Sequence, residues 1–197
     1  MFNELAKQGI KSAIVFWPAF LTDLKNSFNS TYKNEFSDKY NEVKSYTTRP
    51  KRKGEVDEYV FVTKEEFDKL ASENKFINIR DYYTEYGLWR YGTPLEVLLN
   101  TDNPMLILDE QGLENIQNKL GRDNIISILI EADETVRLNR SLNRDEITEQ
   151  NTKEIKRRIK DDDIKFKKRE LYNYILDNNN LDELQKNIKF ILNLNLN

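Results

Sequence analysis

The chain has 197 residues, and at roughly 150 residues per domain this length predicts one domain. It carries 31 Lys and Arg against 34 Asp and Glu, a near balance that argues against a dedicated nucleic-acid-binding protein. The absence of Cys and His excludes disulfides, thiolate metal sites and any Ser-His-Asp triad. No apolar run approaches the ~20 residues of a membrane span, and Met1 to Lys11 has no signal-peptide pattern, so we expect a soluble cytoplasmic protein without a membrane partner.

The N-terminal half predicts a buried strand, a helix and several short extended segments. Residues 12–17 are β-branched and aromatic and end at Pro18, which is typical of a short buried strand. Thr63 and Glu66 have the spacing of a capping box, which predicts the start of a helix at this point. The other elements expected in this half are helices over 22–36 and 95–100 and extended segments over 43–48, 58–63, 76–83 and 88–91.

The C-terminal half alternates apolar strands with amphipathic helices. Residues 104–108 and 124–130 are continuous apolar runs, typical of parallel strands that are buried on both faces. Helices are expected over 111–120, 133–142, 151–168 and 182–192, whereas 171–176 is either a last strand or the end of the preceding helix. The order predicts an α/β fold with a central parallel sheet flanked by helices: a core of 1–48 and 95–197 and a small antiparallel flap at about 49–94.

Two arginines three residues apart are the first candidates for a binding site. Arg49 and Arg52 flank Pro50, whose turn allows both guanidinium groups to converge on one anion. Guanidinium forks match phosphate oxygens in geometry as well as in charge. The alternative interpretation of this stretch alone is a solvated basic loop.

Four motifs in order resemble the guanylate kinase family. They are Ser45-Tyr46-Thr47-Thr48-Arg49-Pro50-Lys51-Arg52-Lys53-Gly54-Glu55, Phe61-Val62-Thr63-Lys64-Glu65-Glu66-Phe67, Tyr91-Gly92-Thr93 and Asp109-Glu110-Gln111-Gly112. The resemblance covers 45–112 well and extends more loosely to the C-terminus. It implies a P-loop-kinase-like core, a nucleotide-binding flap and a helical lid at about 137–168.

The resemblance also implies a mononucleotide pocket with two groups of residues. Arg49, Arg52, Tyr59 and Tyr91 correspond to residues that hold the acceptor phosphate. Ser45, Asn78, Thr93 and Asp109 correspond to residues that lie near the base. Family members have Glu at the position of Asn78, and an amide cannot repeat the double acceptance of a carboxylate. The donor and acceptor of Asn78 suit an adenine-like edge better, unless Asp81 takes the role of the Glu in a shifted register.

The segment after the first strand departs from the family. A Gly-rich loop ending in Gly-Lys-Ser/Thr holds the donor phosphates and magnesium in family members. This chain has Trp17-Pro18-Ala19-Phe20-Leu21-Thr22-Asp23-Leu24-Lys25 there, with no Gly between Gly9 and Gly54. Pro18 donates no N–H and Asp23 stands in the place of the Lys, so the sequence predicts a degenerate P-loop.

The predicted lid is rich in arginine. Arg137, Arg140 and Arg144 resemble arginines that approach the family's lid, and Arg157 and Arg158 resemble the pair on its next helix. The resemblance makes Arg137, Arg144, Arg157 and Arg158 the catalytic candidates. The alternative is that these arginines pair with acids on the same helices, such as Glu134, Asp145 and Glu154. For Asp161-Asp162-Asp163 we expect a solvated turn and no metal site.

Three functions remain open from the sequence. The first is a pseudo-kinase that binds a nucleoside monophosphate or another phosphorylated ligand through the retained acceptor site. The second is an active (deoxy)nucleoside monophosphate kinase with an atypical ATP site; only this one calls for Mg and ATP, and it would rely on Lys25 and the lid arginines. The third is an interaction or inhibitor module with a protein partner, and the composition would fit a phage or mobile element. The aromatic segment 82–89 is a flap hairpin, a stacking platform or a partner surface.

Overall fold

The computed structural model describes residues 12–16, 39–52, 55, 59–144, 148–165 and 167–194. Of residues 12–16, 144 and 161–165 only the backbone is described. The expected helix over 22–36 and the departing segment Trp17 to Lys25 lie outside the described residues. Within these ranges, no helix is long and apolar enough to cross a membrane.

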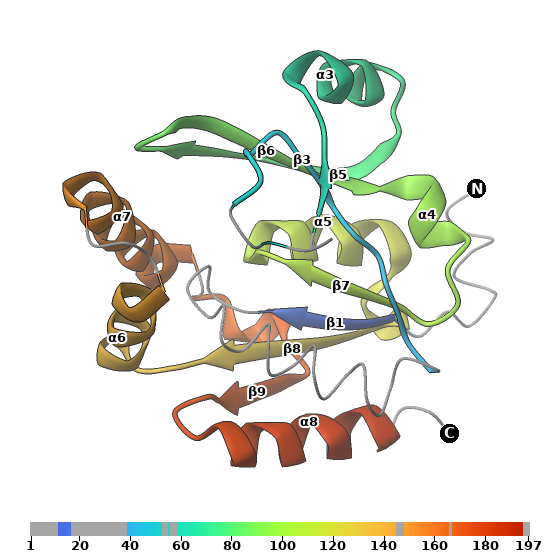
Figure 1. Cartoon of the computed structure of the whole chain (residues 1–197). Coiled ribbons are helices and arrows are strands. Elements are labelled where there is room, and N and C mark those ends of the chain that lie inside the picture. The colour runs from blue at the N-terminus through green and yellow to red at the C-terminus, as the bar shows by residue number, and fades with distance from the viewer. Residues whose placement is uncertain are drawn as a thin grey trace.

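A parallel sheet forms the centre of the molecule, with its strands in the order β2-β7-β1-β8-β9 (Figure 1). Every pairing between neighbours in this sheet is parallel, as the apolar runs predict. Its strands are β1 (Ser12–Phe16), β2 (Asn41–Glu42), β7 (Pro104–Leu108), β8 (Ile125–Glu131) and β9 (Tyr174–Asp177). Residues 174–177 therefore form a last strand and not the end of a helix.

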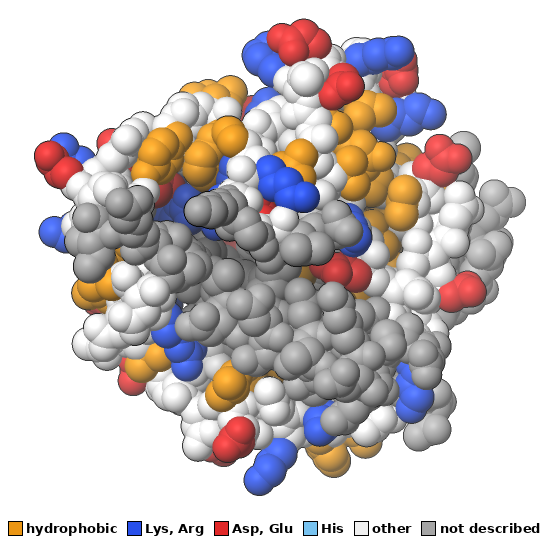
Figure 2. Space-filling model, viewed as in Figure 1, with side chains coloured by type: hydrophobic (Ala, Val, Ile, Leu, Met, Phe, Trp, Pro, Cys, Tyr) orange, Lys and Arg blue, Asp and Glu red, His pale blue; other side chains and the backbone are white. Residues whose placement is uncertain are grey.

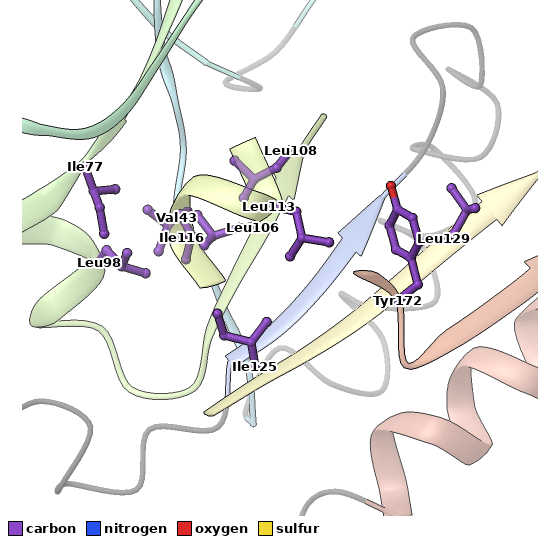
Figure 3. Packing of buried hydrophobic residues seen from close by; sticks show 10 residues of the cluster. All are labelled: Val43, Ile77, Leu98, Leu106, Leu108, Leu113, Ile116, Ile125, Leu129 and Tyr172. Atoms are coloured by element: carbon purple, nitrogen blue, oxygen red, sulfur yellow. The ribbon is translucent and has the colours of Figure 1, made fainter. Parts of the chain in front are cut away.

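Strand β8 shows why the sequence has a continuous apolar run. Ile126, Ile128 and Ile130 pack into one buried cluster with Leu184, Ile188, Ile191 and Leu192 of helix α8 (Leu181–Leu194). Ile125 and Leu129 point to the other face, where they join Leu113 and Ile116 of helix α5 (Glu110–Leu120) (Figure 3). Because alternate side chains of a strand face opposite sides, both faces of β8 lie in the core.

A second sheet lies above the first in Figure 1, with its strands in the order β4-β3-β6-β5. The strands are β3 (Tyr46–Thr47), β4 (Val60–Phe61), β5 (Phe76–Thr84) and β6 (Gly87–Pro94). The expectation of a purely antiparallel flap is wrong, because β3 and β4 pair in parallel; the pairs β3–β6 and β5–β6 are antiparallel. The chain returns to β4 in the same direction as β3 after the loop at Arg49-Pro50. Strand β3 also places the start of this sheet slightly before position 49.

The helices follow the sequence patterns, with shifted ends. Thr63 caps α3 (Lys64–Ser72) through the expected capping box with Glu66. Gly121 ends α5 with a φ of 87°, a conformation that favours glycine. Helices α6 (Glu134–Arg144) and α7 (Glu149–Lys165) lie together at the left of Figure 1 and pack through Ile155 and Ile159 of α7. The remaining helical segments are α4 (Leu95–Leu99), η2 (Arg122–Asn124) and η3 (Arg169–Leu171).

The turn expected at Asp161-Asp162-Asp163 is not present, because these residues belong to α7. The helix continues beyond them to Lys165.

Candidate functional site

One face of the second sheet brings together several of the residues that the motifs single out. In β5, Asn78, Arg80 and Tyr82 are alternate residues and share a face. Their partners across to β6 are Thr93, Tyr91 and Trp89, respectively. Thr47 of β3 lies opposite Tyr91. The sheet thus brings the expected base residues next to the expected phosphate residues.

Arg49 is the most enclosed of the expected phosphate residues, with 5% of its surface exposed. Its Nη1 donates to Glu55 Oε2 at 3.0 Å and to the carbonyl of Pro50 at 2.9 Å, and its Nη2 donates to Glu55 Oε1. Burial alone would lower the pKa of Arg49, but the hydrogen bonds and charge of Glu55 outweigh it and raise the pKa. The guanidinium group stays charged and fixed in direction.

Glu55 completes this pair and was not among the candidate residues. It also accepts the backbone N–H of Arg52 at 2.9 Å, so one carboxylate organises the whole turn. Burial would raise the pKa of Glu55, but the hydrogen bonds from Arg49 and Arg52 lower it. Its position at the end of the first motif, directly after Gly54, is the sequence feature that could have identified it. The side chain of Arg52 lies at the surface.

The aromatic candidates form a chain of ring contacts. The guanidinium carbon of Arg49 lies 5.4 Å from the ring centre of Tyr59. The rings of Tyr59 and Tyr91 meet edge to face at 5.6 Å, and those of Tyr91 and Tyr82 at 5.5 Å. This chain leads from the phosphate candidates to Asp109, because the hydroxyl of Tyr82 donates to Asp109 Oδ2 at 2.6 Å.

Asp109 caps α5, and its carboxylate accepts three hydrogen bonds. Its Oδ1 accepts the N–H of Gly112 at 2.8 Å, and its Oδ2 accepts Arg80 Nε at 2.8 Å beside the Tyr82 hydroxyl. Burial, followed by the neighbouring Asp109 charge, raises the pKa of Tyr82 well above 10, so this phenol remains a donor. Arg80 and Tyr82 were missed by the sequence reasoning, although their i+2 and i+4 spacing from Asn78 places them on its face of the strand.

The remaining base candidates are positioned by backbone and amide contacts. Asn78 is buried, and its Oδ1 accepts a hydrogen bond from Asn115 Nδ2 at 2.8 Å. Thr93 is also buried, and Ser45 is half-buried, with its carbonyl bonded to the N–H of Val60 at 3.0 Å. Asp81 does not replace the missing Glu, because it lies on the other face of β5 and pairs with Arg90 at 3.0 Å.

Two glycines allow the close packing of this site. A Cβ at Gly92 would lie 2.7 Å from the ring of Phe76, which stacks on Phe67. A Cβ at Gly112 would lie 3.0 Å from both Asn78 Nδ2 and Asp109 Oδ1. Steric crowding thus explains why the Tyr-Gly-Thr and Asp-Glu-Gln-Gly motifs have glycine at these two positions.

Protein groups contact the described arginines of the predicted lid. Arg157 Nε donates to Glu154 Oε2 at 2.8 Å, and Arg158 Nε donates to Glu154 Oε1, which agrees with the expectation of pairing along the helix. Arg137 is buried on α6, and Arg140 Nη2 donates to the carbonyl of Asn178 at 3.0 Å. The side chain of Arg144 lies outside the described residues.

Glu154 also ties α7 to the β5–β6 hairpin. Its Oε2 accepts the N–H of Glu85 at 3.2 Å, Gln150 Nε2 donates to the carbonyl of Glu85 at 3.1 Å, and the Tyr86 hydroxyl donates to Asn151. The aromatic segment 82–89 is therefore a hairpin whose tip packs on α7. Hydrophobic side chains gather at the surface over this hairpin at the upper left of Figure 2, where Tyr83, Tyr86 and Leu88 are exposed.

A family model described as Guanylate kinase matches residues 14–195 of the chain. The chain belongs to the guanylate kinase family. The guanylate kinase of Rickettsia felis is 34% identical over 154 residues, which cover 75% of this chain and 76% of that protein. The guanylate kinase of Mycoplasmoides gallisepticum is 31% identical over 157 residues, with 75% of each chain covered. The crystal structure of guanylate kinase from Anaplasma phagocytophilum matches the fold with a TM-score of 0.66 at 24% identity, covering 93% of this chain and 84% of that one.

Proposed function

We propose that this guanylate kinase family member binds a nucleoside monophosphate, or another phosphorylated ligand, in its acceptor site and has lost ordinary ATP-dependent phosphoryl transfer. The observation that carries the proposal is the buried, charged Arg49 held by Glu55 beside Tyr59 and Tyr91. A guanidinium group has five N–H donors. The contacts with Glu55 and Pro50 use three of them, which leaves Nε and one Nη2 hydrogen for an anion.

The charge balance of the site also favours an anionic ligand. Glu55 neutralises Arg49 and so allows its burial, while the exposed Arg52 on the same turn adds a second positive charge. The hydroxyls of Tyr59 and Tyr91 would supply neutral donors to the same group. Hydrogen bonds to charged groups contribute about 1.5–3 kcal/mol each, so a few of them suffice for micromolar affinity.

The sequence supports the loss of kinase activity. The segment Trp17 to Lys25 contains no glycine, and Asp23 brings a negative charge to the place of the phosphate-binding Lys. Because phosphoryl transfer depends on positioning and neutralising the donor phosphates, loss of the loop should cost several orders of magnitude in rate.

An active kinase is the second candidate, and the relation to proteins named guanylate kinase over three quarters of the chain favours it. GMP would then be the acceptor and ATP the donor, with Mg²⁺ at the donor phosphates. Arg137, Arg144, Arg157, Arg158 and Lys25 would take over the donor site. Arg157 and Arg158 would first have to break their ion pairs with Glu154 before they could bind the ligand.

Thermal unfolding with GMP, dGMP, AMP, dAMP and ATP tests the proposal. A monophosphate at 100 times its dissociation constant should add about 2.7 kcal/mol of stability, whereas ATP should add none. The double variant R49Q/E55Q removes the ion pair without leaving a buried charge, and it should lose this response while keeping its fold. Formation of ADP from ATP and a monophosphate, abolished in R49Q/E55Q, would establish the kinase instead. No response to any nucleotide would favour the interaction module.

A further inference from the structure

A chain of amide hydrogen bonds fixes which end of Asn78 is free to meet a base. Gln111 Nε2 donates to Glu114 Oε2 at 3.3 Å and to Asn115 Oδ1 at 3.2 Å. Asn115 Nδ2 then donates to Asn78 Oδ1 at 2.8 Å. A carboxylate only accepts, so Glu114 sets the direction of the whole chain. Asn78 Oδ1 is thereby directed at Asn115, and the other polar atom of this amide, Nδ2, is a donor.

Arg80 adds stronger donors on the same face of β5. Asp109 binds its Nε at 2.8 Å, which uses one of the five N–H groups of the guanidinium. The Arg80 side chain is 28% exposed, whereas that of Asp109 is 10% exposed. Asp109 is therefore the buried partner of the pair, and Arg80 is the partner that reaches the surface. Burial would lower the pKa of Arg80, but the charge and hydrogen bond of Asp109 raise it.

Asn78 and the Arg80 anchor are close to each other. Asn78 Nδ2 and Asp109 Oδ1 each lie 3.0 Å from the position that a Cβ of residue 112 would take. The acceptor atoms at this point already bind protein donors, because Asn78 Oδ1 accepts from Asn115 and the Asp109 carboxylate accepts from three groups. The site therefore offers N–H donors where the family's Glu would accept. The N6 amino group of adenine would need an acceptor here, and Asn78 Oδ1 is directed at Asn115 instead. The structure therefore does not favour the adenine-like edge that the sequence suggests for Asn78.

We propose that Arg80 reads the base of the bound nucleotide, and that the site selects a 6-oxopurine through its O6 and N7 atoms without reading the 2-amino group. This inference rests on the proposed function. Arginine donates to adjacent O6 and N7 acceptors in a fork, whereas adenine presents an N6 amine at the O6 position and would set donor against donor. Hypoxanthine keeps O6 and N7 and lacks only the 2-amino group, so it should be bound as well as guanine.

Calorimetric titration of the full chain with GMP, IMP and AMP tests the selection. GMP and IMP should bind within about 3-fold of each other, and AMP should bind about 10- to 100-fold more weakly. In R80Q the affinities for GMP and IMP should fall about 10-fold or more, while that for AMP changes by less than about 3-fold. R80K provides a second variant that keeps the charge next to Asp109 but removes the fork, and it should show the same loss of selection.

R90Q is the matched control. Arg90 belongs to the same hairpin and is also paired with acids, Asp68 and Asp81, but on the other face of the sheet. The R90Q variant should leave the order of the affinities for GMP, IMP and AMP unchanged. Inorganic phosphate completes the design, because its affinity should be equal in wild type and R80Q if Arg80 contacts the base.

The outcomes separate this inference from the proposed function. Binding of GMP more than about 10-fold tighter than IMP would show that the 2-amino group is read, and would overturn the inference. Equal binding of AMP and GMP would also overturn it, as would a weaker affinity of R80Q for inorganic phosphate. In each of these cases the acceptor site would still bind its ligands. Failure of all three nucleotides and of phosphate to bind would instead contradict the proposed function.

Discussion

The predicted acceptor side and the predicted lid side of the molecule both pair a buried carboxylate with arginine, but with different results. On each side a buried carboxylate, Glu55 or Glu154, holds arginine, and on each side the hydrogen bonds outweigh burial and lower the pKa of that carboxylate. Glu55 orients Arg49 and leaves two of its N–H groups unused by Glu55 and Pro50. Glu154 divides its oxygens between Arg157, Arg158 and the N–H of Glu85. A motif of arginines and acids thus cannot by itself distinguish a ligand site from a tie between two structural elements.

The largest effect on stability should come from removing the Glu154 carboxylate. In E154A two arginines lose their carboxylate and the hairpin loses one of its hydrogen bonds to α7, so the free energy of unfolding should fall by about 3 kcal/mol, as measured by urea denaturation. E149A is the control on the same helix, because Glu149 pairs with Lys153 at an exposed position. It should leave the stability unchanged. If E154A were as stable as wild type, the lid arginines would not be structural.

The next effect concerns the close packing on the acceptor side. In G92A the added Cβ would meet the ring of Phe76 at 2.7 Å, so the flap must shift and the free energy of unfolding should drop by about 2 kcal/mol. The double variant G92A/F76L makes room for the methyl group and should recover part of the loss. Equal stability of G92A and wild type would contradict the steric role of this glycine.

Acid titration compares the two carboxylates directly. Each has a folded pKa below the ordinary Glu value of 4.5, so its stabilising effect is complete above that pH and is lost as the pH falls through the lower, folded pKa. Replacing Glu154 with Gln should therefore flatten the decline of stability below about pH 4.5, by up to about 1.4 kcal/mol per pH unit for one proton. Unfolding free energies measured from pH 6 to pH 3, in steps of about one pH unit, would test this. An unchanged slope in E154Q would show that Glu154 is not ionised in the fold.

The smallest effect should come from a single hydroxyl. Y91F keeps the ring contacts with Tyr59 and Tyr82 but removes one donor from the acceptor site. Affinity for a monophosphate should weaken about 10-fold, in line with the low end, about 1.5 kcal/mol, of hydrogen bonds to charged groups, while the melting temperature stays the same. Titration calorimetry with GMP would measure it, and unchanged affinity would remove Tyr91 from the phosphate-binding group.

Local and periodic features of the fold were predictable from the sequence. The capping box at Thr63, the helix stop at Gly121 and the doubly buried strand β8 each depend on short-range patterns. The parallel pairing of β3 and β4 was not predictable in this way, because it joins segments on either side of the Arg49-Pro50 turn.

The candidate site shows the same limit. The motifs marked Arg49, Asn78 and Asp109, but they did not show which groups already satisfy them. Arg80 reaches Asp109 across 29 positions of the sequence, and Asn115 reaches Asn78 across 37. Such contacts decide whether Asn78 accepts or donates, and only the packing of β5 on α5 reveals them.

The contact between the hairpin and α7 has a practical use. Trp89 stacks on Tyr86 at 5.8 Å, and the guanidinium carbon of Arg158 lies 5.8 Å from its ring centre. The chain has two tryptophans, so W17F would leave Trp89 as the single indole fluorophore. Its emission would then report, in real time and without an attached dye, whether the β5–β6 hairpin and α7 separate when a nucleotide is added.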